Sequence, residues 1–162
     1  MTKQTFRLVQ FSLLIICTLG FAAPAFSQDE WTKEQLQAIY MRHLSQEGYL
    51  PNIDQDGDVQ FKREGKTYFI PVKEDDPGFF AVYLINIYDV TPDNMLAVLQ
   101  ACNKVTANTK VSKVQVIEDK KVWITCETYV SHPEEGMKIF TRCLSSIASA
   151  YNSFREEMLG SE

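Results

Sequence analysis

The chain has 162 residues, of which 45% are hydrophobic and 23% charged, and its formal net charge at pH 7 is −5. A chain of this length can bury one sizeable core, so we expect a single folded domain. Because 21 acidic residues outnumber 16 basic ones and no basic cluster is visible, the composition argues against nucleic acid and anionic membranes as partners.

The amino-terminus has the three parts of a secretory signal peptide. Lys3 and Arg7 supply a positive start, and residues 8–22 form a short apolar run. Small residues then stand at Ala25 and Ser27, the minus-three and minus-one positions of a cut site. The apolar run is shorter than the roughly 20 residues that a membrane-spanning helix needs, so the pattern predicts cleavage.

We therefore expect residues 1–27 to be removed and residues 28–162, beginning at Gln28, to be exported to the periplasm or beyond the cell. No stable membrane insertion is expected once the signal is gone. Two alternatives remain, an uncleaved anchor and a lipoprotein signal centred on Cys17. The second is weakened by Ile16, because lipoprotein signals normally carry a small residue before the cysteine.

A first helix is predicted to start at Thr32. Thr32 and Gln35 form a capping-box pair, in which the hydroxyl and the amide each satisfy a backbone N–H at the helix start. Gly48 suits the left-handed residue that ends such a helix. A polar turn region over residues 49–58 follows.

Three strands are predicted next. Alternating apolar residues indicate strands over 58–63 and 66–73, joined by a tight turn at Glu64-Gly65. Residues 79–88 are apolar on both faces, which is typical of a central strand covered on two sides.

A second helix is expected to open at Thr91-Pro92, with the threonine as cap, and to end near Asn108. Strands over 111–118 and 121–130 then form a second hairpin.

His132-Pro133 opens a third helix, whose apolar residues step by three and four in a heptad seam. A two-stranded coil would need charged residues beside this seam, but its flanks are small or apolar. The wide apolar face predicts a helix that packs on its own sheet. The residues expected to pack inside one chain are Phe140, Leu144, Ile147 and Tyr151.

The expected order of elements is α-β-β-β-α-β-β-α. Two hairpin-linked groups of strands separated by helices indicate one α+β domain over residues 28–162, with a mostly antiparallel five-stranded sheet packed by helices.

This order and several residues resemble the YbjN family, whose fold is like that of type III secretion chaperones. The resemblance covers residues 32–154 and implies a protein-binding or scaffolding module with no active site to carry over. The stretches that carry it are Gly48-Tyr49, residues 54–61, residues 64–68, Ala101 to Val105, Lys110 to Val114, and the helix after His132-Pro133.

An acidic turn deserves comparison with a calcium loop. Asn52, Asp54, Asp56 and Asp58 occupy loop positions 1, 3, 5 and 7, but position 12, which needs a bidentate acid, is Arg63. The turn also leads into a predicted strand. We therefore expect an ordinary acidic turn and no metal site.

No residue set predicts catalysis. His43 falls on the apolar stripe of the first helix and His132 at a helix start, and neither has a ligand partner at metal-binding spacing. Ser145 and Ser146 lie inside a helix, where a nucleophile elbow cannot form. No phosphate-binding glycine loop is visible, so we expect no enzyme and no cofactor.

Three cysteines follow the signal segment, Cys102, Cys126 and Cys143. An odd number allows at most one internal disulfide. Buried apolar thiols are the favoured interpretation, and one bridge stays open in an oxidising compartment.

A protein-binding surface is predicted from aromatic and apolar residues on two strands. One face of the 79–88 strand is expected to pack on helices, and the other either is covered by a further helix or takes a partner or a second copy. The candidate surface consists of Phe80, Val82, Leu84, Tyr88, Trp123 and Tyr129.

The sequence leaves two alternative functions. The first is an exported, non-enzymatic protein-interaction module, chaperone-like or scaffolding, with a protein partner or a homodimer. The second is a ligand-binding or hydrolytic protein of the cell envelope. A grooved apolar surface favours the first, and a closed pocket with converging carboxylates and a histidine favours the second.

Overall fold

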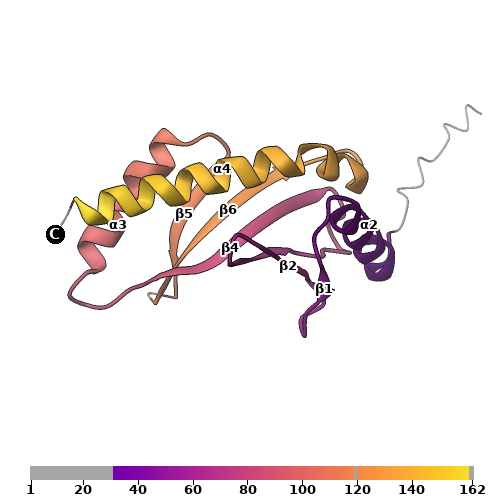
Figure 1. Cartoon of the computed structure of the whole chain (residues 1–162), viewed down its shortest axis with the longest axis horizontal. Coiled ribbons are helices and arrows are strands. Elements are labelled where there is room, and N and C mark those ends of the chain that lie inside the picture. Colours follow the sequence, from indigo (N-terminus) through magenta and orange to yellow (C-terminus); the bar gives the residue numbers. More distant parts are fainter. Residues whose placement is uncertain (1–30, 119, 161–162) are drawn as a thin grey trace, which may run out of the picture. The chain divides into compact units, whose positions relative to one another are not determined.

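The computed structural model describes residues 31–118 and 120–160, and the predicted signal segment lies outside them. The residues from Trp31 onward form one compact unit (Figure 1). Its elements are α2 (Lys33–Gln46), β1 (Asn52–Ile53), β2 (Val59–Arg63), β3 (Lys66–Ile70), β4 (Phe79–Asp89), α3 (Met95–Asn108), β5 (Ser112–Ile117), β6 (Lys121–Tyr129) and α4 (Pro133–Leu159).

The strands form one six-stranded sheet in the order β1-β2-β3-β4-β6-β5, and all its paired strands are antiparallel. The α+β class is therefore confirmed, but the expected count of five strands is wrong. The missed strand is β1, which pairs Asn52 with Gln60 and Ile53 with Val59. Both of its residues are exposed, so no alternation of buried positions marked it in the sequence.

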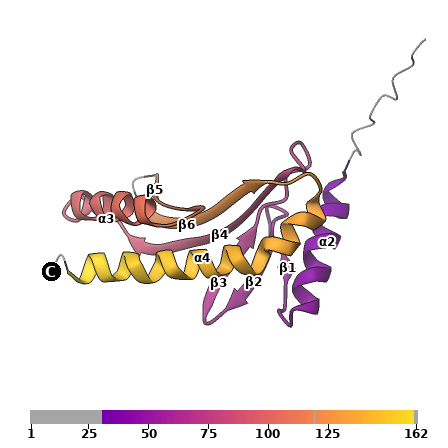
Figure 2. The same cartoon turned by 90° about the horizontal axis from the view of Figure 1, so that it is seen from above.

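All three helices cover the same face of the sheet, and α4 runs along its centre (Figures 1 and 2). Seen from above, the β2–β3 hairpin lies on one side of α4, and α3 on the other. One continuous core fills the space between the helices and this face. Within residues 31–118 and 120–160, no helix covers the other face of β4, so a second covering helix is not found in this part of the chain.

The heptad seam of α4 faces this core. Phe140, Leu144 and Ile147 are each at most 1% exposed within the single chain, and Tyr151 packs half-buried against the same core. The prediction that these four residues pack inside one chain is confirmed. The seam is buried by the sheet because α4 crosses it centrally, so no second helix is needed to cover it.

The start of the helix agrees with the sequence prediction for α2 and α4 but not for α3. Thr32 and Gln35 make both bonds of a capping box, and Pro133 occupies the first turn of α4 behind the cap residue His132. The expected start of α3 is wrong, since the helix begins at Met95. The Asn94 side chain accepts a bond from Thr91 N at 2.8 Å, which holds the preceding residues in a turn.

In the part of the chain that the structure describes, no helix is both long and apolar enough to cross a membrane.

Candidate functional site

The face of the sheet opposite the helices carries two pairs of aromatic rings. Phe79 on β4 and Tyr129 on β6 are register partners with ring centroids 5.9 Å apart. Further along the same strands, the rings of Tyr83 and Trp123 lie 6.3 Å apart. We call this side of the sheet, with Phe69 on β3, which pairs with Tyr83, the open face.

The open-face rings are accessible to different degrees. Tyr129 is 76% exposed, and the other four aromatic residues are half-buried. Tyr and Trp join a large apolar area to a polar tip, which is why such residues are enriched where proteins meet. The open face thus offers an aromatic surface that no helix of the described chain covers.

Polar groups between the two ring pairs are mutually satisfied. Thr125 donates a hydrogen bond to the Glu127 carboxylate at 2.7 Å, and Lys113 on β5 forms an ion pair with the same carboxylate. Burial raises the pKa of the Tyr83 hydroxyl to about 12, with further contributions from the negative charges of Glu127 and Asp58. Tyr83 is therefore a neutral hydroxyl at physiological pH.

The predicted surface divides between the two sides of the sheet. Phe80, Val82 and Leu84 are at most 2% exposed and belong to the core, so including them in a surface was wrong. Tyr88 also lies on the helix side, where its ring stacks edge-on against Phe154 at 5.7 Å. The physical reason is the two-residue period of a strand, which sends even-numbered positions of β4 up to Leu84 toward the helices.

Trp123 and Tyr129 are the two predicted residues that do lie on the open face. Their neighbours Phe69, Phe79 and Tyr83 were not predicted as surface residues. The signal that would have found them is the alternation of β6, since residues paired across an antiparallel ladder share a face.

A cleft opens where β3 and β4 separate. The two strands pair only at Tyr68 with Leu84 and at Phe69 with Tyr83, although both strands continue. The β4–β6 register also breaks between Leu84 and Tyr88. The cleft has a volume of about 670 Å³ and is lined by Gln60, Lys62, Lys66, Thr67, Phe69, Leu84, Ile85, Asn86, Ile87 and Tyr151.

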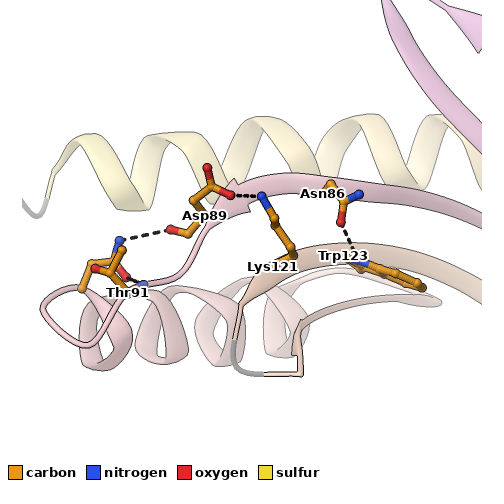
Figure 3. Close-up of polar contacts among 6 residues, drawn as sticks. Asn86, Asp89, Thr91, Lys121 and Trp123 are labelled. Carbon is orange, nitrogen blue, oxygen red and sulfur yellow. Dashed lines mark hydrogen bonds and ion pairs between the residues drawn. The ribbon is translucent and has the colours of Figure 1, made fainter.

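Asn86 stands at this break in the left-handed conformation, with φ of 54°. Its side-chain oxygen accepts a hydrogen bond from the Trp123 indole at 3.1 Å (Figure 3). A second contact between these strands is the ion pair of Asp89 with Lys121. Bulges of this kind re-aim side chains and are over-represented beside functional sites. The Asn86–Trp123 hydrogen bond thus links the open face to the cleft, which also share Phe69.

The acidic turn over residues 52–58 is closed by its own bonds. Asp54 Oδ1 accepts from the backbone N–H groups of Asp56 at 3.0 Å and Asp58 at 2.9 Å. The Lys33 ammonium of α2 donates to the Asp56 carbonyl at 2.8 Å. A cation thus already occupies the side of the turn that α2 faces, which supports the expectation that calcium does not bind.

The remaining candidate groups do not converge. No cluster of three His, Cys, Asp or Glu side chains suited to a metal occurs among the described residues. The His43 ring meets Phe140 edge-on at 5.5 Å, and its Nε2 is buried without a hydrogen-bond partner in the described chain. His132 is exposed at the start of α4.

The three cysteines are free and buried. Burial raises the pKa of Cys102 to about 11. A hydrogen bond with Cys143 and burial both raise the pKa of Cys126. The same hydrogen bond lowers the pKa of Cys143. Cys102 and Cys126 are thus held as neutral thiols, which are poor nucleophiles, and this agrees with the favoured apolar role for these two residues.

Among solved structures, the chain is similar to YbjN from E. coli, for which a role as a transcription regulator has been suggested. The two align with a TM-score of 0.57 at 12% identity, over 77% of this chain and 93% of YbjN. The fold is YbjN-like. The resemblance drawn from the sequence is thereby confirmed at the level of the fold, which is all that an alignment of such low identity shows.

An uncharacterized protein from Methanothermobacter thermautotrophicus aligns with a TM-score of 0.44 at 16% identity, over 76% of this chain and 94% of that chain. No protein-family model and no curated protein sequence matches the chain.

Proposed function

We propose that this YbjN-like domain is an exported protein-interaction module that binds its partner on the open face. The observation that carries the proposal is the aromatic surface formed by the Phe79–Tyr129 and Tyr83–Trp123 pairs on the side of the sheet that the helices leave uncovered. Rings of this kind dominate the energetics of protein interfaces.

The chemistry around the cleft supports this proposal over hydrolysis. Neither a carboxylate nor a histidine is among the residues that line the cleft at the β3–β4 separation. Carboxylates and histidines are the groups that most often supply general acid–base chemistry to hydrolases. The net negative charge of the chain likewise favours a protein over a nucleic acid as the partner on the open face.

The test is partner capture that depends on the open face. Immobilised protein is incubated with envelope extract, and the captured proteins are compared for wild type, Tyr129→Ser and Leu50→Ser. Leu50 is 91% exposed and does not lie in the sheet, so its variant controls for the loss of an exposed apolar side chain. We expect capture to be lost with Tyr129→Ser and kept with Leu50→Ser. Equal capture by all three would refute the proposed face.

A second copy is the other candidate occupant of the open face. Sedimentation equilibrium of the wild type and Tyr129→Ser tests this directly. A dimer that Tyr129→Ser dissociates would assign the face to self-association, whereas a monomeric wild type leaves it to a different protein.

The export part of the proposal rests on the signal pattern of residues 1–27. Protein recovered from outside the cytoplasm of the producing cell is expected to begin at or near Gln28. Amino-terminal sequencing that reads from Met1 would contradict cleavage at this site.

A further inference from the structure

The break between β3 and β4 leaves a stretch of central strand without neighbours. Residues 85–87 have no register partner on β3, and they also fall within the register break between β4 and β6. A central strand normally pairs on both sides, so three unpartnered positions mark an opening in the sheet. The 670 Å³ cleft occupies this opening.

The cleft is basic, although the chain as a whole is acidic. Its only charged lining residues are Lys62 and Lys66, while the chain carries 21 acidic residues and a net charge of −5. Neither lysine forms an ion pair with a carboxylate of the described residues, whereas Arg63, which lies between them in the chain, is paired with Glu64 at 3.4 Å. The two side chains leave the β2–β3 hairpin on opposite faces, because Lys62 pairs with Thr67 and Lys66 with Arg63. The ammonium on the helix side of the sheet is that of Lys66.

A third cation lies beside the same cleft. The Lys66 ammonium lies 4.6 Å from the ring centroid of Tyr151, and the Arg155 guanidinium approaches the same ring at 5.9 Å. Tyr151 therefore stands where the positive groups of the β2–β3 hairpin and of α4 meet.

An apolar recess adjoins the cleft at this tyrosine. The recess has a volume of about 180 Å³ and shares Ile87 and Tyr151 with the cleft. Apart from Arg155, its lining is apolar or aromatic, and its remaining members are Tyr88, Phe154, Met158 and Leu159. A positive mouth that continues into an apolar recess matches a ligand with a negative head and an apolar tail.

We infer that the cleft and recess bind a single-chain anionic amphiphile, a carboxylate on an unbranched alkyl chain. The Lys66 ammonium and the Arg155 guanidinium, which meet at the Tyr151 ring, bind the carboxylate, and the chain passes Ile87 and Tyr151 into the recess. The cleft shares Phe69 with the open face, but Tyr129 lines neither the cleft nor the recess, so partner capture and dodecanoate binding can each be lost without the other.

The Trp123 indole gives a direct signal of occupancy. It donates to Asn86 Oδ1, and Asn86 lines the cleft. We expect the ¹H–¹⁵N resonance of this indole to shift when dodecanoate is added below its micelle-forming concentration. Isothermal titration measures the affinity in parallel.

Head-group and tail dependence distinguish this site from general detergent binding. We expect dodecyl maltoside and dodecyltrimethylammonium to bind at least about tenfold more weakly than dodecanoate, because a charge-assisted contact contributes that much. Shortening the chain from dodecanoate to decanoate should weaken binding by about fourfold per methylene withdrawn from the recess.

The matched variants change the same charge inside and outside the cleft and recess. Lys66→Gln with Arg155→Gln should weaken dodecanoate binding by about tenfold or more. Lys73→Gln with Lys138→Gln removes two exposed lysines that line neither cavity and should leave affinity unchanged. Met158→Ser should reduce the dependence on chain length without altering the preference for an anionic head.

Several results would overturn the inference. They are no binding of dodecanoate, equal binding of the three head groups, and an equal loss of affinity in the two double variants. If an acidic peptide shifts the Trp123 indole resonance and dodecanoate does not, the cleft is assigned to a peptide instead. Circular dichroism of each variant confirms that it is folded before its affinity is compared.

Discussion

Replacing Leu144 by alanine tests how α4 is held. Leu144 is 1% exposed and lies between Phe140 and Ile147 on the seam that faces the sheet, so its side chain is enclosed by the core. Truncation removes its buried methyl groups and leaves a cavity that the close-packed neighbours refill only in part. Such substitutions cost about 2–5 kcal/mol. We expect about 3 kcal/mol here, because the adjacent Phe140 ring can shift part of the way into the space.

The assay is urea denaturation at several protein concentrations. With a slope of about 1–3 kcal/mol per molar urea, the midpoint should fall by about 1 M or more. Leu159→Ala is the control, because Leu159 is in the same helix but 65% exposed, and its change should stay within about 0.5 kcal/mol. If the loss for Leu144→Ala instead depends on protein concentration and the separated monomer remains folded, the seam is an interface between chains and our reasoning fails.

Three further predictions concern the turn, the packing of α4 and alkaline pH. The acidic turn should show no micromolar calcium site by calorimetry, and a site lost on Asp56→Ala would contradict this. Gly136→Ala should destabilise the fold by about 1–3 kcal/mol, because its Cβ would meet a buried phenylalanine ring of β4 at 2.5 Å, whereas Gly160→Ala, whose nearest contact is 3.5 Å, should be close to neutral in thermal melts. Burial raises the pKa of Tyr40 and Tyr83 from 10.0 to about 12, so the unfolded chain loses these protons first and stability should fall as pH rises from about 10 toward 12. Urea midpoints at about pH 9 and pH 11 check the sign, and Tyr83→Phe should lessen the fall.

Local signals in the sequence predicted local structure well. The capping box depends only on Thr32 and Gln35, which are three residues apart in the chain. Pro133 favours a helix start because its ring fixes one φ angle. Both helix starts could therefore be predicted without knowing the fold. The seam of α4 was readable for a similar reason, because helical periodicity places its residues on one side whatever lies opposite.

Features that depend on contacts between distant parts of the chain could not be predicted from the sequence in this way. The alternation of β4 separates its residues into two sets, but which set meets the helices depends on where the helices lie, and this reversed the roles of Phe80 and Tyr83. The cleft was missed because it arises from where two strands stop pairing. Asn86 adopts its left-handed conformation without the glycine that would have marked a bulge in the sequence.

The central place of α4 also bears on the order in which the domain can fold. Every strand precedes α4 in the chain, yet α4 contacts β4, β5, β6 and both other helices. Until this last helix has been delivered to the compartment where the domain folds, the middle of the apolar sheet face has no cover. Closure of the core must wait for α4, because its contacts with strands far earlier in the chain carry a loop-closure entropy that slows their formation. The emerging polypeptide therefore passes through a stage in which its strands are complete and its core is still open to water or to a chaperone.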